Sequence, residues 1–308
     1  MDAAARRGLG AALLALLLAV AAPIASAADA IRVASKLDTE SALLGTMILK
    51  ALNARGIATI NKLRLGPTNI LRRALVAGDI DIYPEYTGNG AIFHAMTGDP
   101  VWKDAQAGYD KVKALDAKQG ITWLAPAPAD NSWVIAVPRD IAAKEGLKSL
   151  ADFARWVKAG GTVRLAASAE FVESPAALPA LEAAYGFTLT RSQILTLAGG
   201  DTAVTMRAAA EHISGVNAAM AYGTDGALAV LGLVALSDPR QAEIVYAPAP
   251  VLRASVLAQH PEIGAALDPI FRSLDQATLQ RLSAAISVDG RSSDEVAREY
   301  LKGKGLLN

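Results

Sequence analysis

The sequence predicts an α/β protein that is built from two lobes. From residue 31 onward, short apolar runs alternate with amphipathic helical stretches, as strands and helices do when they share a core. About 280 residues can form one large or two medium domains. No low-complexity linker and no internal repeat divides the chain, which favours two lobes joined by crossovers over two independent domains.

The first 27 residues are predicted to be a cleaved signal peptide. Arg6 and Arg7 precede an almost purely apolar run over residues 9–22, and Ala25-Ser26-Ala27 supplies the small residues that signal peptidase needs. The alternative is a membrane anchor, but the apolar run is shorter than the roughly 20 residues of a span. We therefore expect export to the periplasm and a mature chain that begins near Ala28.

The composition argues against several classes of function. The chain has 30 Lys and Arg residues and 30 Asp and Glu residues, so it lacks the basic surface that nucleic acids require. It has no Cys, which excludes disulfides, a lipid anchor and thiolate chemistry. His94, His212 and His260 have no metal-ligand spacing. Neither a phosphate-binding loop nor a nucleophile elbow occurs, so we expect no metal, no cofactor and no catalytic residue.

The first lobe is expected to contain three strands and two helices before its chain leaves for the second lobe. A helix opens at Thr39 and ends at Gly56, because its apolar residues recur at helical spacing up to that glycine. A proline, Pro84, is expected to close the third strand. The predicted elements are strands 31–34, 58–60 and 80–83 and helices 39–55 and 69–77.

The second lobe is expected to begin after Pro128 and to return near residue 222. Its predicted elements are strands 133–137, 163–167 and 218–222 and helices 150–158, 179–185 and 202–212. From Pro261 onward the chain is mostly helical and completes the first lobe. The first lobe then comprises residues 28–130 and 226–308, and the second comprises residues 131–225. Such an arrangement leaves a ligand cleft at the carboxyl ends of the strands.

Three segments that follow predicted strands carry a resemblance to a known family. They are Ser35-Lys36-Leu37-Asp38-Thr39-Glu40, the Y-P-E-Y-T-G string at 83–88 and Tyr222-Gly223-Thr224-Asp225-Gly226. In this order they resemble the substrate-binding components of ABC importers for glycine betaine, choline and related osmoprotectants, of the OsmF (YehZ)-like quaternary-amine-binding kind. The resemblance extends over the mature chain. It implies a two-lobed periplasmic binding protein fold (type II-like), an inner-membrane ABC permease as partner and a monomeric protein.

A quaternary ammonium group requires a particular kind of site. It has no N–H to donate, so several aromatic faces bind it best, each contributing about 0.5–2 kcal/mol. Only 5% of the residues are aromatic, which makes those that follow strands informative. The resemblance implies a cage of Tyr86, Trp133, Tyr222 and Tyr246. The alternative is that these four are ordinary half-buried aromatic residues.

The resemblance also implies which residues hold a ligand carboxylate. Lys36 matches a lysine of the family, and Asn89 stands where relatives often carry Thr. Ser174 stands where relatives commonly have an Arg that clamps the carboxylate, and this loss of a guanidinium fork removes a strong contact. Glycine betaine is therefore expected to bind only modestly. Each of the three could instead be an ordinary polar residue near a loop.

Two other functions are kept open. An enzyme of the same fold could act on a small amine, although no nucleophile–base pair can be named. A binding protein for another solute, such as an amino acid or an anion, would need a carboxylate or an Arg at its site, and the aromatic set would then have no explanation.

Overall fold

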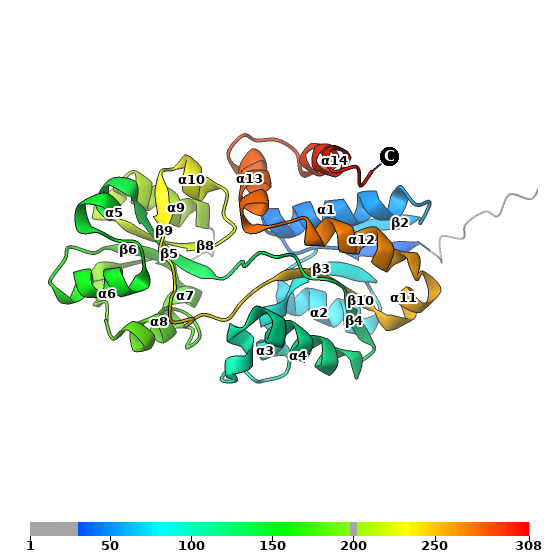
Figure 1. The fold of residues 1–308 in the computed structure, drawn as a ribbon, viewed down its shortest axis with the longest axis horizontal. Coiled ribbons are helices and arrows are strands. Elements are labelled where there is room, and N and C mark those ends of the chain that lie inside the picture. The colour runs from blue at the N-terminus through cyan, green and yellow to red at the C-terminus, as the bar shows by residue number, and fades with distance from the viewer. Residues whose placement is uncertain (1–29, 198–201, 308) are drawn as a thin grey trace, which may run out of the picture. The chain divides into compact units, whose positions relative to one another are not determined.

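The computed structural model describes residues 30–197 and 202–307, which form two five-stranded sheets with helices (Figure 1). The predicted signal peptide lies outside the described residues. The first sheet has the order β2-β1-β3-β10-β4, with β1 Ile31–Ala34, β2 Thr59–Lys62, β3 Ile82–Tyr86, β4 Ile121–Trp123 and β10 Pro248–Arg253. The second has the order β7-β6-β8-β5-β9, with β5 Trp133–Pro138, β6 Leu165–Ser168, β7 Ile194–Leu197, β8 Ala218–Tyr222 and β9 Leu233–Ala235.

The two sheets share one topology. In each, three neighbouring strands run parallel, and the fourth position holds an antiparallel strand, β10 in the first sheet and β5 in the second. Each antiparallel strand is the one that the chain enters directly after crossing from the other lobe (Figure 1). The predicted α/β class with two lobes is confirmed.

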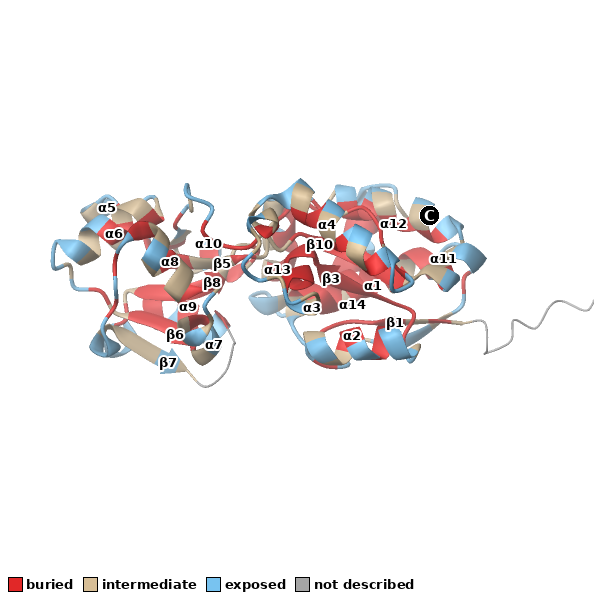
Figure 2. Cartoon of the chain, turned by 90° about the horizontal axis from the view of Figure 1, so that it is seen from below, coloured by how far each residue is buried: buried red, intermediate tan, exposed pale blue. Residues whose placement is uncertain are grey.

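Helices cover both faces of each sheet, so the central strands are buried between them, whereas the edge strands β2 and β7 are largely exposed or only half-buried (Figure 2). Separate apolar cores lie on the two faces of each sheet. The helices of the first lobe are α1 Thr39–Asn53, α2 Thr68–Ala77, α3 Gly90–Phe93, α4 Ala105–Ala117, α11 Ala254–Gln259, α12 Glu262–Arg272, α13 Gln276–Ser287 and α14 Ser293–Gly303. Those of the second are α5 Arg139–Glu145, α6 Leu150–Lys158, α7 Ala169–Glu173, α8 Leu178–Tyr185, α9 Thr202–Ala210 and α10 Ala227–Val230. No helix in the described ranges is long and apolar enough to cross a membrane.

Capping residues place the helix that contributes to the site. Asp38 precedes α1 and accepts a hydrogen bond of 2.7 Å from the backbone N–H of Ser41, which satisfies one of the open donors of the first turn. This cap places Glu40 in the first turn of α1, directly after the carboxyl end of β1. At the C-terminus of α2, Gly78 adopts a φ of 79°, a conformation that glycine reaches without a steric cost.

The third strand continues through Pro84, where the sequence predicted its end. Pro84 pairs with Pro250 of the antiparallel strand β10. Neither proline has an N–H, so the two occupy a non-hydrogen-bonded pair of the ladder, where no donor is needed. The strand therefore reaches Tyr86 and carries that residue to the carboxyl edge of the sheet.

The second lobe extends beyond its expected boundary at residue 225. Strand β9 follows that boundary and pairs with β5 over Ala136–Pro138, and Leu228 and Leu233 pack in a core of the second sheet. The apolar run over 226–236, expected to return to the first lobe, instead contributes part of its residues to the core of the second sheet, while Val230 is exposed and Gly226 packs against α13. The second crossover therefore lies between β9 and β10.

Candidate functional site

A cavity of about 780 Å³ opens at the edge where the parallel strands of both sheets end. Six of the seven predicted site residues line it: Lys36, Tyr86, Asn89, Trp133, Tyr222 and Tyr246. Ser174 is not among the lining residues. The cavity has the size typical of small-molecule sites, which commonly enclose about 300–1,000 Å³.

Three of the four predicted aromatic residues form one cluster around Trp133. Trp133 at the start of β5 pairs in register with Tyr222 at the end of β8, and their rings stack with centroids 6.4 Å apart and planes at 22°. Tyr246, from the second crossover, meets Trp133 edge-on at 6.3 Å. Burial raises the pKa of Tyr222 to about 12. The cluster thus presents uncharged aromatic faces to the cavity.

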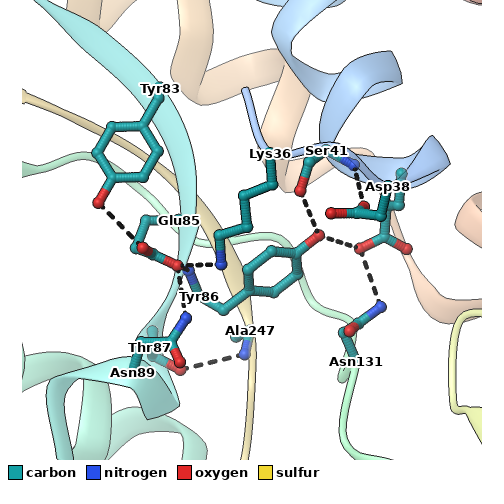
Figure 3. A network of polar contacts seen from close by, with 11 residues as sticks. Lys36, Asp38, Ser41, Tyr83, Glu85, Tyr86, Thr87, Asn89, Asn131 and Ala247 are labelled. Carbon is teal, nitrogen blue, oxygen red and sulfur yellow. Dashed lines mark hydrogen bonds and ion pairs between the residues drawn. The ribbon is translucent and has the colours of Figure 1, made fainter. Parts of the chain in front are cut away.

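Tyr86 reaches the cavity from the first lobe. Its hydroxyl donates a hydrogen bond of 2.9 Å to Oε1 of Glu40 and lies 3.3 Å from the hydroxyl of Ser41 (Figure 3). Burial and the nearby Glu40 carboxylate raise the pKa of Tyr86 well above its ordinary value. These contacts hold the ring at the end of β3, so the structure brings all four aromatic residues to the same cavity.

The predicted carboxylate ligands Lys36 and Asn89 both contact one buried residue, Glu85. The ammonium of Lys36 lies 2.6 Å from Oε1 of Glu85, and the amide of Asn89 donates to the same oxygen at 2.7 Å (Figure 3). Tyr83 donates to the other oxygen at 2.9 Å. Glu85 is fully buried, so the charge of Lys36 is balanced inside the protein. The ammonium also lies 4.5 Å from the centre of the Tyr86 ring.

Ser174 lies at the end of α7, away from the lining of the cavity. Its backbone N–H donates to the carbonyl oxygen of Glu170 at 2.9 Å and closes the last turn of that helix. Glu170, four residues earlier, does line the cavity. The side chain that α7 contributes to the cavity lining is therefore the carboxylate of Glu170.

Sequence reasoning did not single out three further residues that line the cavity, Glu40, Asn131 and Thr224. Asn131 of the first crossover donates to Oε1 of Glu40 at 3.2 Å and also donates to the hydroxyl of Thr224 in the turn after β8. Glu40 and Thr224 belong to the motifs quoted above, so the sequence already placed both residues near the ends of strands. Their mutual contacts were not, because 91 residues separate Glu40 from Asn131 along the chain.

Acidic residues outnumber basic ones in the lining. Asp38, Glu40, Glu170 and Asp225 line the cavity together with Lys36 and Arg207. Lys36 is paired with Glu85, and the exposed Arg207 lies 3.8 Å from Glu211. Within the residues that the structure describes, no group of three or more His, Cys, Asp or Glu side chains could hold a metal ion.

Comparison with known proteins places this architecture in a family. Residues 29–303 match the model of the substrate-binding domain of ABC-type glycine betaine transport systems. The chain is 55% identical to the glycine betaine-binding protein YehZ of Escherichia coli (strain K12) over 95% of its own length and 96% of that relative. It is 32% identical to a glycine-betaine-binding protein of Pseudomonas aeruginosa, with 91% and 90% covered. The solved structure of apo YehZ from Escherichia coli matches with a TM-score of 0.78 over 90% of this chain and 99% of that one, at 56% identity.

Proposed function

Because the chain belongs to the family of substrate-binding domains of ABC-type glycine betaine transport systems, we propose that its cavity binds a quaternary ammonium compound such as glycine betaine. The family is one of solute-binding proteins and not of enzymes. Two relatives with 55% and 32% identity are glycine betaine-binding proteins by name. The resemblance of the strand-end motifs to osmoprotectant-binding proteins agrees with this assignment.

The observation that carries the proposal is the aromatic cluster of Trp133, Tyr222 and Tyr246 on the cavity wall, with Tyr86 on the same cavity. A trimethylammonium group attracts the negative faces of aromatic rings, and the attraction is strongest where water is excluded. Acidic residues in the lining favour a cation further. Four aromatic side chains from four different segments of the chain have no comparable use in binding an anion.

The carboxylate of a betaine meets a less favourable site. Lys36 and Asn89 are proposed as its partners, but the buried Glu85 balances the charge of Lys36. An ion pair attracts an anion only as a dipole, which is weaker than a free charge. Ser174 supplies no guanidinium. This supports modest binding of glycine betaine.

The proposed cellular role is capture of the ligand in the periplasm and its delivery to an ABC permease in the inner membrane. The protein is proposed to act there as a monomer whose two lobes close on the ligand by a hinge at the crossovers. It would carry out no chemistry, since its output is a closed form that the permease recognises.

Isothermal titration and thermal-shift measurements over a panel of solutes test this function. The panel contains glycine betaine, choline, carnitine, ectoine, proline and several amino acids. A ligand that binds only the folded protein raises the unfolding temperature, and the stabilisation grows with the logarithm of 1 + [L]/Kd. We expect quaternary amines to bind and amino acids not to bind. Saturable binding of an amino acid without any binding of a quaternary amine would contradict the proposal, and product formation during incubation would favour an enzyme.

A further inference from the structure

Glu40 is an unusual member of the cavity lining because one of its two carboxylate oxygens accepts no hydrogen bond from the residues that the structure describes. The side chain is buried, and only 6% of the residue is exposed. Oε1 accepts hydrogen bonds from Tyr86 and Asn131. Oε2 is also buried, but it makes no hydrogen bond within the described part of the chain. No Lys or Arg pairs with this carboxylate among the described ion pairs. A buried, unpaired carboxylate of this kind is costly unless it is protonated or meets a ligand.

The location of Glu40 fits contact with a ligand. Glu40 lines the same cavity as Tyr86 and Trp133. The indole N–H of Trp133 and the hydroxyl of Ser283 are also buried without a hydrogen bond in the described part of the chain, and both residues line this cavity too. Three buried polar groups without a hydrogen bond to the described residues therefore line one cavity, as expected where a polar ligand binds. Glu40 is the titratable one of the three.

We propose that Glu40 is the residue that recognises the carboxylate of a betaine-type ligand, by donating a hydrogen bond from Oε2 as a carboxylic acid. This inference rests on the proposed function and names the anion partner that Lys36, Asn89 and Ser174 do not provide on their own. Because Oε1 already accepts two hydrogen bonds, the proton belongs on Oε2, the oxygen that is free to donate. A hydrogen bond between a carboxylic acid and a carboxylate is charge-assisted and about twice as strong as a neutral one.

The surroundings of Glu40 make the acid form available near neutral pH. Burial raises the pKa of Glu40 to about 7, although the Thr224 hydroxyl beside it acts in the opposite direction. Asp38 and Asp225 raise this pKa further, and the Tyr86 hydroxyl lowers it. Binding of a zwitterionic betaine would thus take up a proton at Glu40, whereas binding of a cation without a carboxylate would favour loss of that proton.

Titrations at pH 6, 7 and 8 with glycine betaine and choline test the proposal. The dissociation constant of glycine betaine should rise about tenfold from pH 6 to pH 8, because the fraction of protonated Glu40 falls by that factor around a pKa near 7. Choline should show the opposite trend. The carboxylate of glycine betaine stays ionised throughout this range, so the ligand adds no dependence of its own. Calorimetry in two buffers of different ionisation enthalpy should show proton uptake with glycine betaine and proton release with choline.

Two matched variants separate this role from a general effect of charge. Glu40→Gln keeps an oxygen that can accept from Tyr86 and Asn131, and it places a permanent N–H donor where Oε2 stands. This variant should therefore bind glycine betaine at pH 8 as tightly as the native protein does at pH 6, and its affinity should not depend on pH. Glu170→Gln removes a negative charge from the same cavity and should keep the native pH dependence. Thermal unfolding of both variants checks that they fold.

The outcomes distinguish this inference from the proposed function. Two results would overturn the role of Glu40 while leaving quaternary-amine binding intact. One is that the native protein binds glycine betaine equally tightly at pH 6, 7 and 8, and the other is that Glu40→Gln binds it more weakly at every pH. An equal loss of pH dependence in Glu170→Gln would assign the effect to the overall charge of the cavity. If neither glycine betaine nor choline binds at any pH, the proposed function itself fails.

Discussion

The ammonium of Lys36 lies 2.6 Å from the carboxylate of Glu85 in a pair that is almost completely buried. Lys36 follows β1, and Glu85 lies on the neighbouring strand β3, so parallel pairing brings together two residues that are 49 positions apart. Glu85 also accepts hydrogen bonds from Tyr83 and Asn89. Lys36 is therefore part of the architecture of the cavity wall, in addition to any contact that it makes with a ligand.

Replacing Lys36 by Met should destabilise the protein strongly. Met keeps the apolar length of the side chain but leaves the buried Glu85 without a counter-charge, which typically costs about 3–5 kcal/mol. Denaturant unfolding measures the loss. The control is Lys62→Met on the exposed strand β2, which should change the free energy of unfolding by less than about 0.5 kcal/mol. Equal effects of the two substitutions would show that the buried pair contributes nothing to stability.

Substitution of Tyr86 by Phe should affect the protein differently from substitution of Tyr222 by Phe. The Tyr86 hydroxyl donates to the buried Glu40, so its removal should cost about 1–3 kcal/mol of stability. Tyr222 is only half-buried, and Tyr222→Phe keeps the ring that stacks on Trp133. Quaternary-amine affinity should therefore stay close to native in Tyr222→Phe. Thermal unfolding and calorimetric titration of both variants check this, and identical behaviour would argue against the Tyr86–Glu40 contact.

Replacing Trp133 by Ala should weaken binding of a quaternary amine by about tenfold or more. Trp133 contacts both Tyr222 and Tyr246, so its removal takes away one cation–π face and the support of two others. Trp156→Ala is the matched control, because Trp156 is equally half-buried and packs edge-on against Phe153 outside the cavity lining. A similar loss of affinity in both variants, or native affinity in Trp133→Ala, would remove Trp133 from the cage.

Replacing Ser174 by Arg should tighten glycine betaine binding and leave choline binding unimproved. Ser174 ends α7 four residues after Glu170, which lines the cavity. A guanidinium at this position could reach the cavity and either contact the ligand carboxylate or neutralise Glu170. Ser174→Met supplies similar length without charge and should leave both affinities near native. Titrations of the two variants with both ligands decide the matter, and equal effects of Arg on glycine betaine and choline would show that residue 174 does not act on the carboxylate.

Glu243, in the second crossover, should make stability depend on pH. Both of its carboxylate oxygens are buried without a hydrogen bond in the described part of the chain. Burial, together with Asp238 and Asp130, raises the pKa of Glu243 to about 9. The folded protein thus holds this proton more strongly than the unfolded chain does, so stability should fall as the pH rises from about 4.5 towards about 9.

Glu243→Gln should remove that dependence. The variant should match the native protein at pH 5 and exceed it at pH 7 by at most about 3 kcal/mol, since each unit between the two pKa values corresponds to about 1.4 kcal/mol. Denaturant unfolding at both pH values gives the comparison. A variant that is less stable than the native protein at pH 7 would mean that the Glu243 carboxylate has a partner that Gln cannot replace.

Local patterns in the sequence predicted six of the ten described strands and the helices that follow most of them, but they did not predict β4, β7, β9 or β10. Helical spacing and a capping residue locate α1, and the apolar run at the start of the first lobe locates β1. The resemblance to osmoprotectant-binding proteins, carried by short motifs at the ends of strands, indicated Tyr86 and Tyr222, and the carboxyl ends of parallel strands are where ligands bind in such sheets. Each of these signals depends only on residues that lie close together in the chain, so it can be read from a single sequence without a structure.

Tertiary structure decided the end of β3, the extent of the second lobe and the partners of the polar side chains. The strand passes Pro84 because another proline faces it in the ladder, and β9 joins the second sheet through pairing with β5. Glu85 balances the charge of Lys36, and one oxygen of Glu40 has no hydrogen-bond partner within residues 30–197 and 202–307. Each of these depends on residues far apart in the chain and on burial, which sets the cost of an unpaired charge. The sequence alone therefore indicated six residues that line the cavity, whereas only the folded structure placed Glu40, Asn131 and Thr224 beside them, left Ser174 out, and determined which of the charges are available to a ligand.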